Sequence, residues 1–257
     1  MNIHIKSKEE QDKMRAAGKL AAQTLEMIEP HVKVGVTTDE LNTLVHDFTT
    51  NSGAICAPLN YHGFPKSVCI SVNDVACHGI PGDYVLQDGD IVNIDVTPKL
   101  DGWHGDTSKM FLVGDVSKED RELCEIAHGA LWAGIGAIAP GRDVKTIGDA
   151  IQLFMTRKPA SIAKEFCGHG TGSTFHEAPQ ILHYSSWNTG TLMVPGLIFT
   201  IEPIINAGKS WTKTCPKDKW TVTTNDGKKS AQWEHTILIT EDGFEILTLR
   251  EEENGQI

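Results

Sequence analysis

Two amphipathic helices are predicted near the start of the chain, where apolar residues recur at intervals of three and four. Ser7 and Glu10 form a capping box, in which side chain and backbone of the first helical turn satisfy each other. The apolar positions then continue towards Glu29 and Pro30 as Met14, Ala17, Ala21, Leu25 and Ile28. A second capping box, Thr37 with Glu40, precedes another such series at Leu41, Leu44, Val45 and Phe48.

A hairpin with two acids is predicted further along, after a strand-like run at 67–72. Residues 91–96 read as a strand covered on both faces, and Asp95 interrupts this apolar run. Placing the following turn on either Leu100-Asp101 or Asp101-Gly102 puts Asp95 and Asp106 on the same face, opposite or diagonal to each other. Two carboxylates crowded in apolar surroundings take up a proton or share a cation. The alternative is a pair of surface aspartates that flank a turn.

The order of elements recurs about one hundred residues later. When the sequence is aligned with itself at an offset of 106 residues, Gly35 aligns with Gly141. The apolar positions of 41–48 then align with those of 147–154. At an offset of 107 residues, the strand-like residues 89–95 align with 196–202, so that Glu202 is the counterpart of Asp95. We therefore expect a single catalytic domain over 1–257, with helix-helix-strand halves of about 1–112 and 113–250 related by an approximate twofold axis. Both acids would then reach the seam between the halves.

The second half departs from the first by an insert at 207–229, which holds six lysines and two aspartates. A turn signal at 225–227 is followed by the run 232–239, predicted as one strand that carries Glu234 into apolar company. The polar tail from Arg250 to Ile257 is expected to be frayed.

Charge and composition restrict the class of protein. The formal net charge of -11 argues against general nucleic-acid binding. The N-terminus has no apolar segment of signal-peptide length, and no run approaches the roughly 20 apolar residues of a membrane span. Six scattered cysteines form no CxxC pair, so neither a zinc finger nor a dense disulfide framework is indicated. A cytoplasmic, reducing setting is expected.

Four acids and one histidine are candidates for a metal centre. His169 lies between glycines in the segment 167–172, which would give its imidazole a clear path to an ion, although a structural histidine is as good an interpretation of that residue alone. An oxygen-rich set of four carboxylates and one imidazole suits a pair of Mn, Fe or Co ions better than one tetrahedral Zn. Two such ions can activate a water and hold a carbonyl oxygen, which is the chemistry of a hydrolase.

Five segments, 61–81, 90–111, 167–184, 195–205 and 230–240, resemble the methionine aminopeptidases of the short bacterial type. The resemblance covers nearly the whole chain and implies a pita-bread fold of the α/β (α+β) class, two related halves with a curved antiparallel sheet. It implies two divalent ions (Co, Mn, Fe or Zn) between the halves. The ligand positions fall on Asp95, Asp106, His169, Glu202 and Glu234. By similarity, Asp106 and Glu234 would bridge the ions.

The resemblance also implies catalytic roles. His78 looks like the residue that contacts the substrate backbone, and His176 like the one that polarises the scissile carbonyl and the developing oxyanion. A metal-bound hydroxide would attack that carbonyl, with Glu202 as the proton shuttle. Without the resemblance, a structural role is the alternative for both histidines, and it is a stronger alternative for His78 than for His176.

A pocket for methionine is implied as well, because aromatic rings suit a thioether. By similarity its lining is Tyr61, Phe64, Cys69, Phe175 and Trp220, each of which could otherwise be plain core. A site for a monovalent cation, Na or K, would map to Asn73, Val75 and Ser230. The chain departs from many bacterial members at Pro58, Phe64 and Thr171, which puts substrate affinity in doubt but not the metal chemistry.

The function implied is removal of the initiator methionine from nascent chains whose second residue is small, by a monomer away from the membrane. One alternative is a proline-directed relative, prolidase or aminopeptidase P, although these usually carry an additional N-terminal domain. Another is a non-enzymatic binding member of the fold, although such members lose ligand residues. The lysine-rich insert suggests docking to ribosomal RNA near the nascent-chain exit, and a solvated loop is the alternative.

Overall fold

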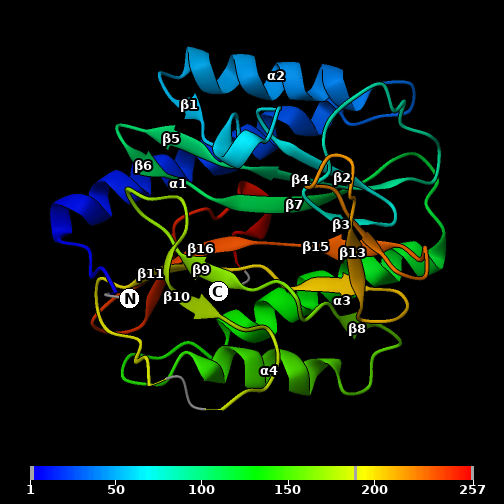
Figure 1. Cartoon of the computed structure of the whole chain (residues 1–257). Helices are drawn as coiled ribbons and strands as arrows, with labels where there is room; N and C mark the ends of the chain where they lie inside the picture. Colours follow the sequence, from blue (N-terminus) through cyan, green and yellow to red (C-terminus); the bar gives the residue numbers. More distant parts are fainter. Residues whose placement is uncertain (1–2, 188–189, 256–257) are drawn as a thin grey trace.

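Both predicted N-terminal helices form in the computed structural model, which describes residues 3–187 and 190–255. They are α1 (Lys8–Ile28) and α2 (Thr38–Asn51), and both capping boxes are present. The 3-10 turn η1 (Glu29–His31) follows α1 at the predicted proline. The second half supplies α3 (Lys118–Ile135) and α4 (Lys145–Met155). Figure 1 shows α2 above the strands and α3 and α4 below them, with α1 running close to the strands of the first half.

The strands between the helix pairs form antiparallel sheets. In the first half, β2 (Cys69–Val72), β4 (Ile91–Val96) and β7 (Thr107–Leu112) lie in that order. In the second half the order is β10 (Glu177–Ile181), β9 (Gly168–Gly170), β11 (Ile198–Ile201), β16 (His235–Ile239) and β17 (Phe244–Ile246). One apolar cluster lies against α1 and α2, and another lies against α3 and α4, where Ile91 and Met110 of the first half join it. Each helix pair therefore packs mainly, but not exclusively, with residues of its own predicted half.

Three small sheets complete the part of the chain that the structure describes. Their orders are β1-β5-β6, β15-β12-β8 and β13-β14-β3. The first contains β1 (Ile55–Cys56), β5 (Pro98–Leu100) and β6 (Trp103–His104). The second contains β15 (Ser230–Gln232), β12 (Ile204–Asn206) and β8 (Ser161–Ile162), and the third β13 (Thr212–Thr214), β14 (Val222–Thr224) and β3 (Val75–Cys77). The 3-10 turns η2 (Tyr61–Gly63) and η3 (Glu251–Glu253) lie in connecting segments.

The predicted hairpin has the second of its two possible turns. Asp101 and Gly102 have φ values of 48° and 89°, the left-handed pair that a tight two-residue hairpin turn requires. One register runs through both parts of the hairpin, since Lys99 pairs with His104 and Asp95 with Ser108. Asp95 and Asp106 consequently lie on the same face, as predicted, and of the two predicted placements the diagonal one is found.

The two halves share backbone details at the offsets read from the sequence. Gly35 N donates to Leu86 O over 2.9 Å, and Gly141 N donates to Met193 O over 2.7 Å. Gly89 and Gly196 also have φ values of 90° and 89°. This agreement supports the proposal that the chain is one domain made of two halves, near 1–112 and 113–250.

Two expectations from the sequence are wrong. The run 232–239 is not one strand, because β15 ends at Gln232 and β16 begins at His235. The reason is a change of partner: β15 pairs with β12, β16 pairs with β11, and Glu234 lies at the switch in an isolated bridge to Ser108.

The start of the polar tail is not frayed. Arg250 and Glu253 are each 1% exposed, because their side chains pair over 2.6 Å and the guanidinium lies 5.5 Å from the ring centre of Trp233. Residues 256 and 257 of the tail lie outside the described residues. In the described part of the chain, no helix is both long and apolar enough to cross a membrane.

Candidate metal centre and substrate pocket

Sheet geometry brings Glu202 and Glu234 together. β11 and β16 are antiparallel with Ile201 opposite His235, so the next pair beyond the ladder is Glu202 and Glu234. Both strands break at this point, β11 at Glu202 before Pro203 and β16 at Glu234. The acids therefore leave the ladder at the seam that Asp95 and Asp106 reach from the first half.

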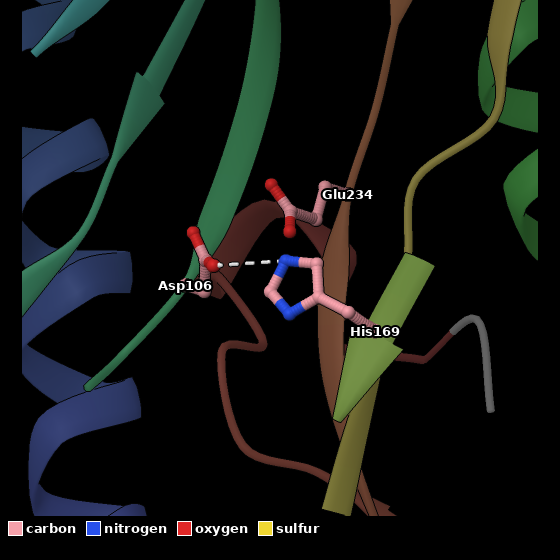
Figure 2. A group of neighbouring side chains, drawn as sticks. All are labelled: Asp106, His169 and Glu234. Carbon is pink, nitrogen blue, oxygen red and sulfur yellow. Dashed lines mark ion pairs between the residues drawn. The ribbon is translucent and has the colours of Figure 1, made fainter. Parts of the chain in front are cut away.

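His169 directs one ring nitrogen at these acids. Its Nδ1 lies 2.9 Å from Gly170 O, a group that only accepts, so Nδ1 carries the proton and Nε2 keeps its lone pair. Nε2 lies 3.7 Å from Asp106 Oδ2 and 3.5 Å from Glu202 Oε1. One ligand atom each from Asp106, His169 and Glu234 lie within 4.8 Å of one another. Figure 2 shows these three side chains converging from three separate elements.

The glycines beside His169 are required by close packing of β9. A Cβ on Gly168 would lie 2.2 Å from Thr200 O, and one on Gly170 would lie 2.3 Å from Ala178 O. Either substitution would force β9 away from β11 or β10. The glycines thus hold the imidazole of His169 against the strand that leads to Glu202.

Hydrogen bonds from three further side chains orient the acids. Thr97 Oγ1 donates to Asp106 Oδ1 over 2.9 Å, and Thr200 Oγ1 donates to Glu202 Oε1 over 2.7 Å. Gln232 Nε2 lies 3.3 Å from Glu202 Oε2. The sequence analysis missed all three. Strand alternation could have found them, because each lies two residues from an acid, and residues two apart share a face.

Burial makes the acids reluctant to ionise. It raises the pKa of Asp95 to about 7. Burial first, and repulsion by neighbouring acids second, raise the pKa values of Asp106, Glu202 and Glu234 well above their usual range. Burial also lowers the pKa of His169 to about 4, so this imidazole is neutral at pH 7. A neutral imidazole amid crowded carboxylates fits divalent cations, which would relieve the repulsion.

The acids lie in a cavity of about 300 Å³. It is lined by all five proposed metal ligands, by His78 and His176, and by the five residues predicted for the methionine pocket. Further lining residues that the sequence analysis did not assign to the site are Thr97, Cys77, Glu165, Phe166, Cys167, Ile204 and Gln232. Carboxylate and imidazole side chains that could bind metal therefore share one cavity with apolar and aromatic side chains.

Aromatic rings from both halves form the apolar wall. Trp220 packs edge-on against Phe64 and His78, with ring centres 5.3 and 5.7 Å apart. Tyr61 lies 4.9 Å from Phe175, and its hydroxyl lies 2.8 Å from His176 Nδ1. The ring centres of Phe166 and His78 lie 5.8 Å apart. The signal in the sequence that could have assigned Phe166 to the site is its position next to the glycine segment 167–172.

Comparison with known proteins agrees with this geometry. The profile of metallopeptidase family M24 matches residues 12–241. A methionine aminopeptidase of Escherichia coli (strain K12) is 53% identical over 255 residues, which cover 98% of this chain and 96% of that protein. The crystal structure of methionine aminopeptidase from Rickettsia prowazekii has a TM-score of 0.94 at 52% identity, covering 96% of this chain and 100% of that one.

The chain belongs to the methionine aminopeptidases of metallopeptidase family M24. Its predicted pita-bread fold is confirmed by the likeness to the solved structure of a family member. Prolidase from Pyrococcus furiosus, at 23% identity and a TM-score of 0.76, shares the fold alone, with 96% of this chain and 66% of that one covered. The relatives thus favour the methionine aminopeptidase interpretation over the proline-directed one.

The positions predicted for a monovalent cation lie close together in this family member. Ser230 N donates to Asn73 O over 2.8 Å, and Val75 follows Asn73 at the start of β3. Asn73 has a φ of 55°, which turns the backbone between β2 and β3. Of the departures from the family pattern, Pro58 and Phe64 line the cavity, and Thr171 is fully buried within the glycine segment 167–172.

A buried ion pair holds the loop of His176. Lys6 Nζ lies 2.6 Å from Glu177 Oε2, with the two side chains 1% and 12% exposed. Because removing one member leaves the other charge buried, Lys6→Met is expected to lower the free energy of unfolding by about 3 kcal/mol, measured by urea denaturation. The matched control is Lys13→Met, whose exposed pair with Glu9 contributes little. Equal losses in the two variants would contradict this account.

Proposed function

We propose that the chain removes the initiator methionine from nascent proteins whose second residue is small. The observation that carries this proposal is the cavity that combines four carboxylates and one imidazole, the proposed metal ligands, with an aromatic wall. The proposal is also supported by the family to which the chain belongs and by its similar relatives, which are named methionine aminopeptidase.

Two divalent ions would be held by Asp95, Asp106, His169, Glu202 and Glu234, and the family resemblance implies that Asp106 and Glu234 would be shared between them. Co, Mn, Fe and Zn are the candidates, since the set offers carboxylates and one imidazole. When bound, the ions would lower the pKa of a water and polarise the scissile carbonyl. The raised pKa values of the acids support this assignment, because the free cluster disfavours full ionisation.

His176 is proposed to donate a hydrogen bond to the scissile carbonyl oxygen. Burial first, and the neighbouring imidazole of His169 second, lower the pKa of His176 to about 3, so its ring is neutral at pH 7. The hydroxyl of Tyr61 contacts Nδ1 and can donate to it, which leaves the proton of the neutral ring on Nε2 for the substrate. Glu202 is the proposed proton shuttle, and His78 the contact to the substrate backbone.

The pocket for the methionine side chain is proposed to be the wall of Tyr61, Phe64, Cys69, Phe175 and Trp220. Such a wall accepts a thioether and excludes charge. It separates apolar side chains by only about 1–3 kcal/mol per methylene, so norleucine should be accepted.

Cleavage of the peptides Met-Ala-Ser and Met-Lys-Ser tests the proposed function. With added Co or Mn, release of methionine from the first should far exceed release from the second. Equal cleavage, or none of either peptide, would reject the substrate. An Ala-Pro peptide tests the proline-directed alternative, and its preferential cleavage would also reject the proposal.

The lysine-rich insert is the proposed contact with ribosomal RNA, in a cytoplasmic monomer. Five of its lysines are exposed: Lys209, Lys213, Lys217, Lys219 and Lys228. The sixth, Lys229, pairs with Asp120 over 2.9 Å and is excluded from the test. Changing the five to glutamate should reduce cosedimentation with ribosomes at low salt, because phosphate contacts are electrostatic. Unchanged cosedimentation would leave the insert a solvated loop.

The bound monovalent ion is proposed to be Na or K at Asn73, Val75 and Ser230. Its proposed role is to stabilise the turn that joins β2 to β3. Replacing Na and K by tetramethylammonium should then lower the melting temperature.

A further inference from the structure

The two acids proposed to share the metal ions are joined through their backbones by reciprocal hydrogen bonds. Thr107 Oγ1 donates to Glu234 O over 2.6 Å, and Thr236 Oγ1 donates to Asp106 O over 2.7 Å. Each hydroxyl thus comes from the chain segment of one acid and binds the carbonyl of the other. We propose that this pair, the threonine clasp of Thr107 and Thr236, sets the separation of the two carboxylates. The inference rests on the proposed function, in which Asp106 and Glu234 are metal ligands.

The clasp joins two chain segments that are paired by only an isolated β-bridge. β7 belongs to one sheet and β16 to another, and an isolated bridge links Ser108 to Glu234, with Glu234 N donating to Ser108 O over 3.1 Å. A regular ladder would fix the spacing of two strands by repeated bonds. Here the two hydroxyls supply additional links directly at the acids.

Burial makes these hydroxyl bonds difficult to replace. Thr107 and Thr236 are both 0% exposed. A carbonyl that loses its donor at this depth cannot turn to bulk water, and the backbone must shift to satisfy it. The position of each acid therefore depends on the hydroxyl that comes from the opposite strand.

The C-terminal segment fixes the direction of the clasp. Arg250 Nη1 lies 3.1 Å from Thr107 Oγ1, and a guanidinium only donates. The hydroxyl of Thr107 must accept from Arg250, so its single proton points at Glu234 O. On the other side, Thr248 Oγ1 accepts from Thr236 N over 3.1 Å. The segment that begins at Thr248 consequently braces both threonines.

Both threonines are positioning residues, since neither hydroxyl touches a carboxylate of the site. Outer groups that orient metal ligands typically change metal affinity by about 10- to 100-fold when removed. Valine is the matching substitution, because it keeps the shape of threonine and removes the hydroxyl.

The experiment measures metal affinity directly, with Thr107→Val, Thr236→Val and a control. The control is Thr24→Val in α1, where an equally buried hydroxyl donates to Leu20 O over 2.7 Å. Co(II) is titrated into each metal-free protein by calorimetry, and the visible spectrum of bound Co(II) is recorded. Circular dichroism and melting temperature of the metal-free proteins report folding.

Both clasp variants should bind Co(II) at least about 10-fold more weakly than wild type, with an altered spectrum. Thr24→Val should lose melting temperature but keep the wild-type affinity and spectrum. Thr107→Ser and Thr236→Ser, which retain the hydroxyl, should restore the affinity.

Clasp variants that bind Co(II) as tightly as Thr24→Val would overturn the inference while leaving the proposed function intact. A wild-type protein that binds neither Co(II) nor Mn(II) would instead overturn the proposed function and the clasp with it. Where a valine variant does not fold, Arg250→Lys tests the same bond from outside the ligand strands. Its expected result is weaker Co(II) binding, and unchanged affinity would count against the clasp.

Discussion

Replacing Asp106 by asparagine is expected to abolish methionine release and to weaken divalent metal binding by more than about 100-fold. This expected loss of metal affinity is larger than the loss of about 10- to 100-fold that follows removal of a group that only orients a ligand, because Asp106 is itself a proposed ligand. Asp106 is 3% exposed, and one of its oxygens lies 3.7 Å from His169 Nε2. Asparagine keeps the shape and the oxygen that accepts from Thr97, but removes the charge. Calorimetric titration of Mn(II), together with the peptide assay, measures both effects.

The same substitution should stabilise the metal-free fold at neutral pH. Burial and the neighbouring Asp95 raise the pKa of Asp106, which means that the folded state disfavours its charge. Asparagine cannot ionise and so avoids this cost of folding, and the melting temperature of the metal-free protein should therefore rise. Asp47→Asn, at an exposed position of α2, is the control and should leave affinity and melting temperature unchanged. Wild-type affinity in Asp106→Asn would refute the role of Asp106 as a ligand.

His176→Gln is expected to lower kcat by about 100- to 1000-fold, the usual effect of removing one donor to a developing oxyanion. Metal affinity should stay near that of wild type, because His176 is not a proposed ligand although its ring centre lies 4.3 Å from that of His169. Steady-state kinetics on Met-Ala-Ser and Mn(II) calorimetry separate the two properties.

The partner of His176 gives a graded comparison. Tyr61→Phe removes the hydroxyl that contacts Nδ1 while retaining the ring, so a smaller loss of kcat is expected. His31→Gln, at an exposed position in η1, serves as the control for histidine substitution. A His176→Gln enzyme with wild-type kcat would show that the ring lines the cavity without acting on the carbonyl.

Local signals made much of the fold predictable. Capping boxes are contained within four residues, so Ser7 with Glu10 and Thr37 with Glu40 identified both helix starts. That Asp95 and Asp106 share a face followed from strand alternation, which depends on the number of residues between them and not on distant contacts. The choice between the two turns remained open because both turns put Asp95 and Asp106 on the same face of the hairpin.

Features that depend on distant partners were missed or misjudged. Residues 232–239 form an apolar run, yet β15 and β16 pair with different strands and separate at Glu234. Arg250 looks like a solvated tail residue because the local sequence does not show that a carboxylate, a hydroxyl and a ring surround its guanidinium. In the fold it contacts Thr107, Trp233 and Glu253. Burial of such a charge is acceptable only where partners are already in place.

The sequence by itself determined which residue types could meet at a metal centre and which strand face Asp95 and Asp106 share, since both follow from spacing along the chain. The tertiary structure alone decided that Thr107 bonds to Glu234 and Thr236 to Asp106, across about 130 residues of chain. Hydrogen bonds require atoms to approach within about 3 Å, and that closeness arises only when separate strands are packed together.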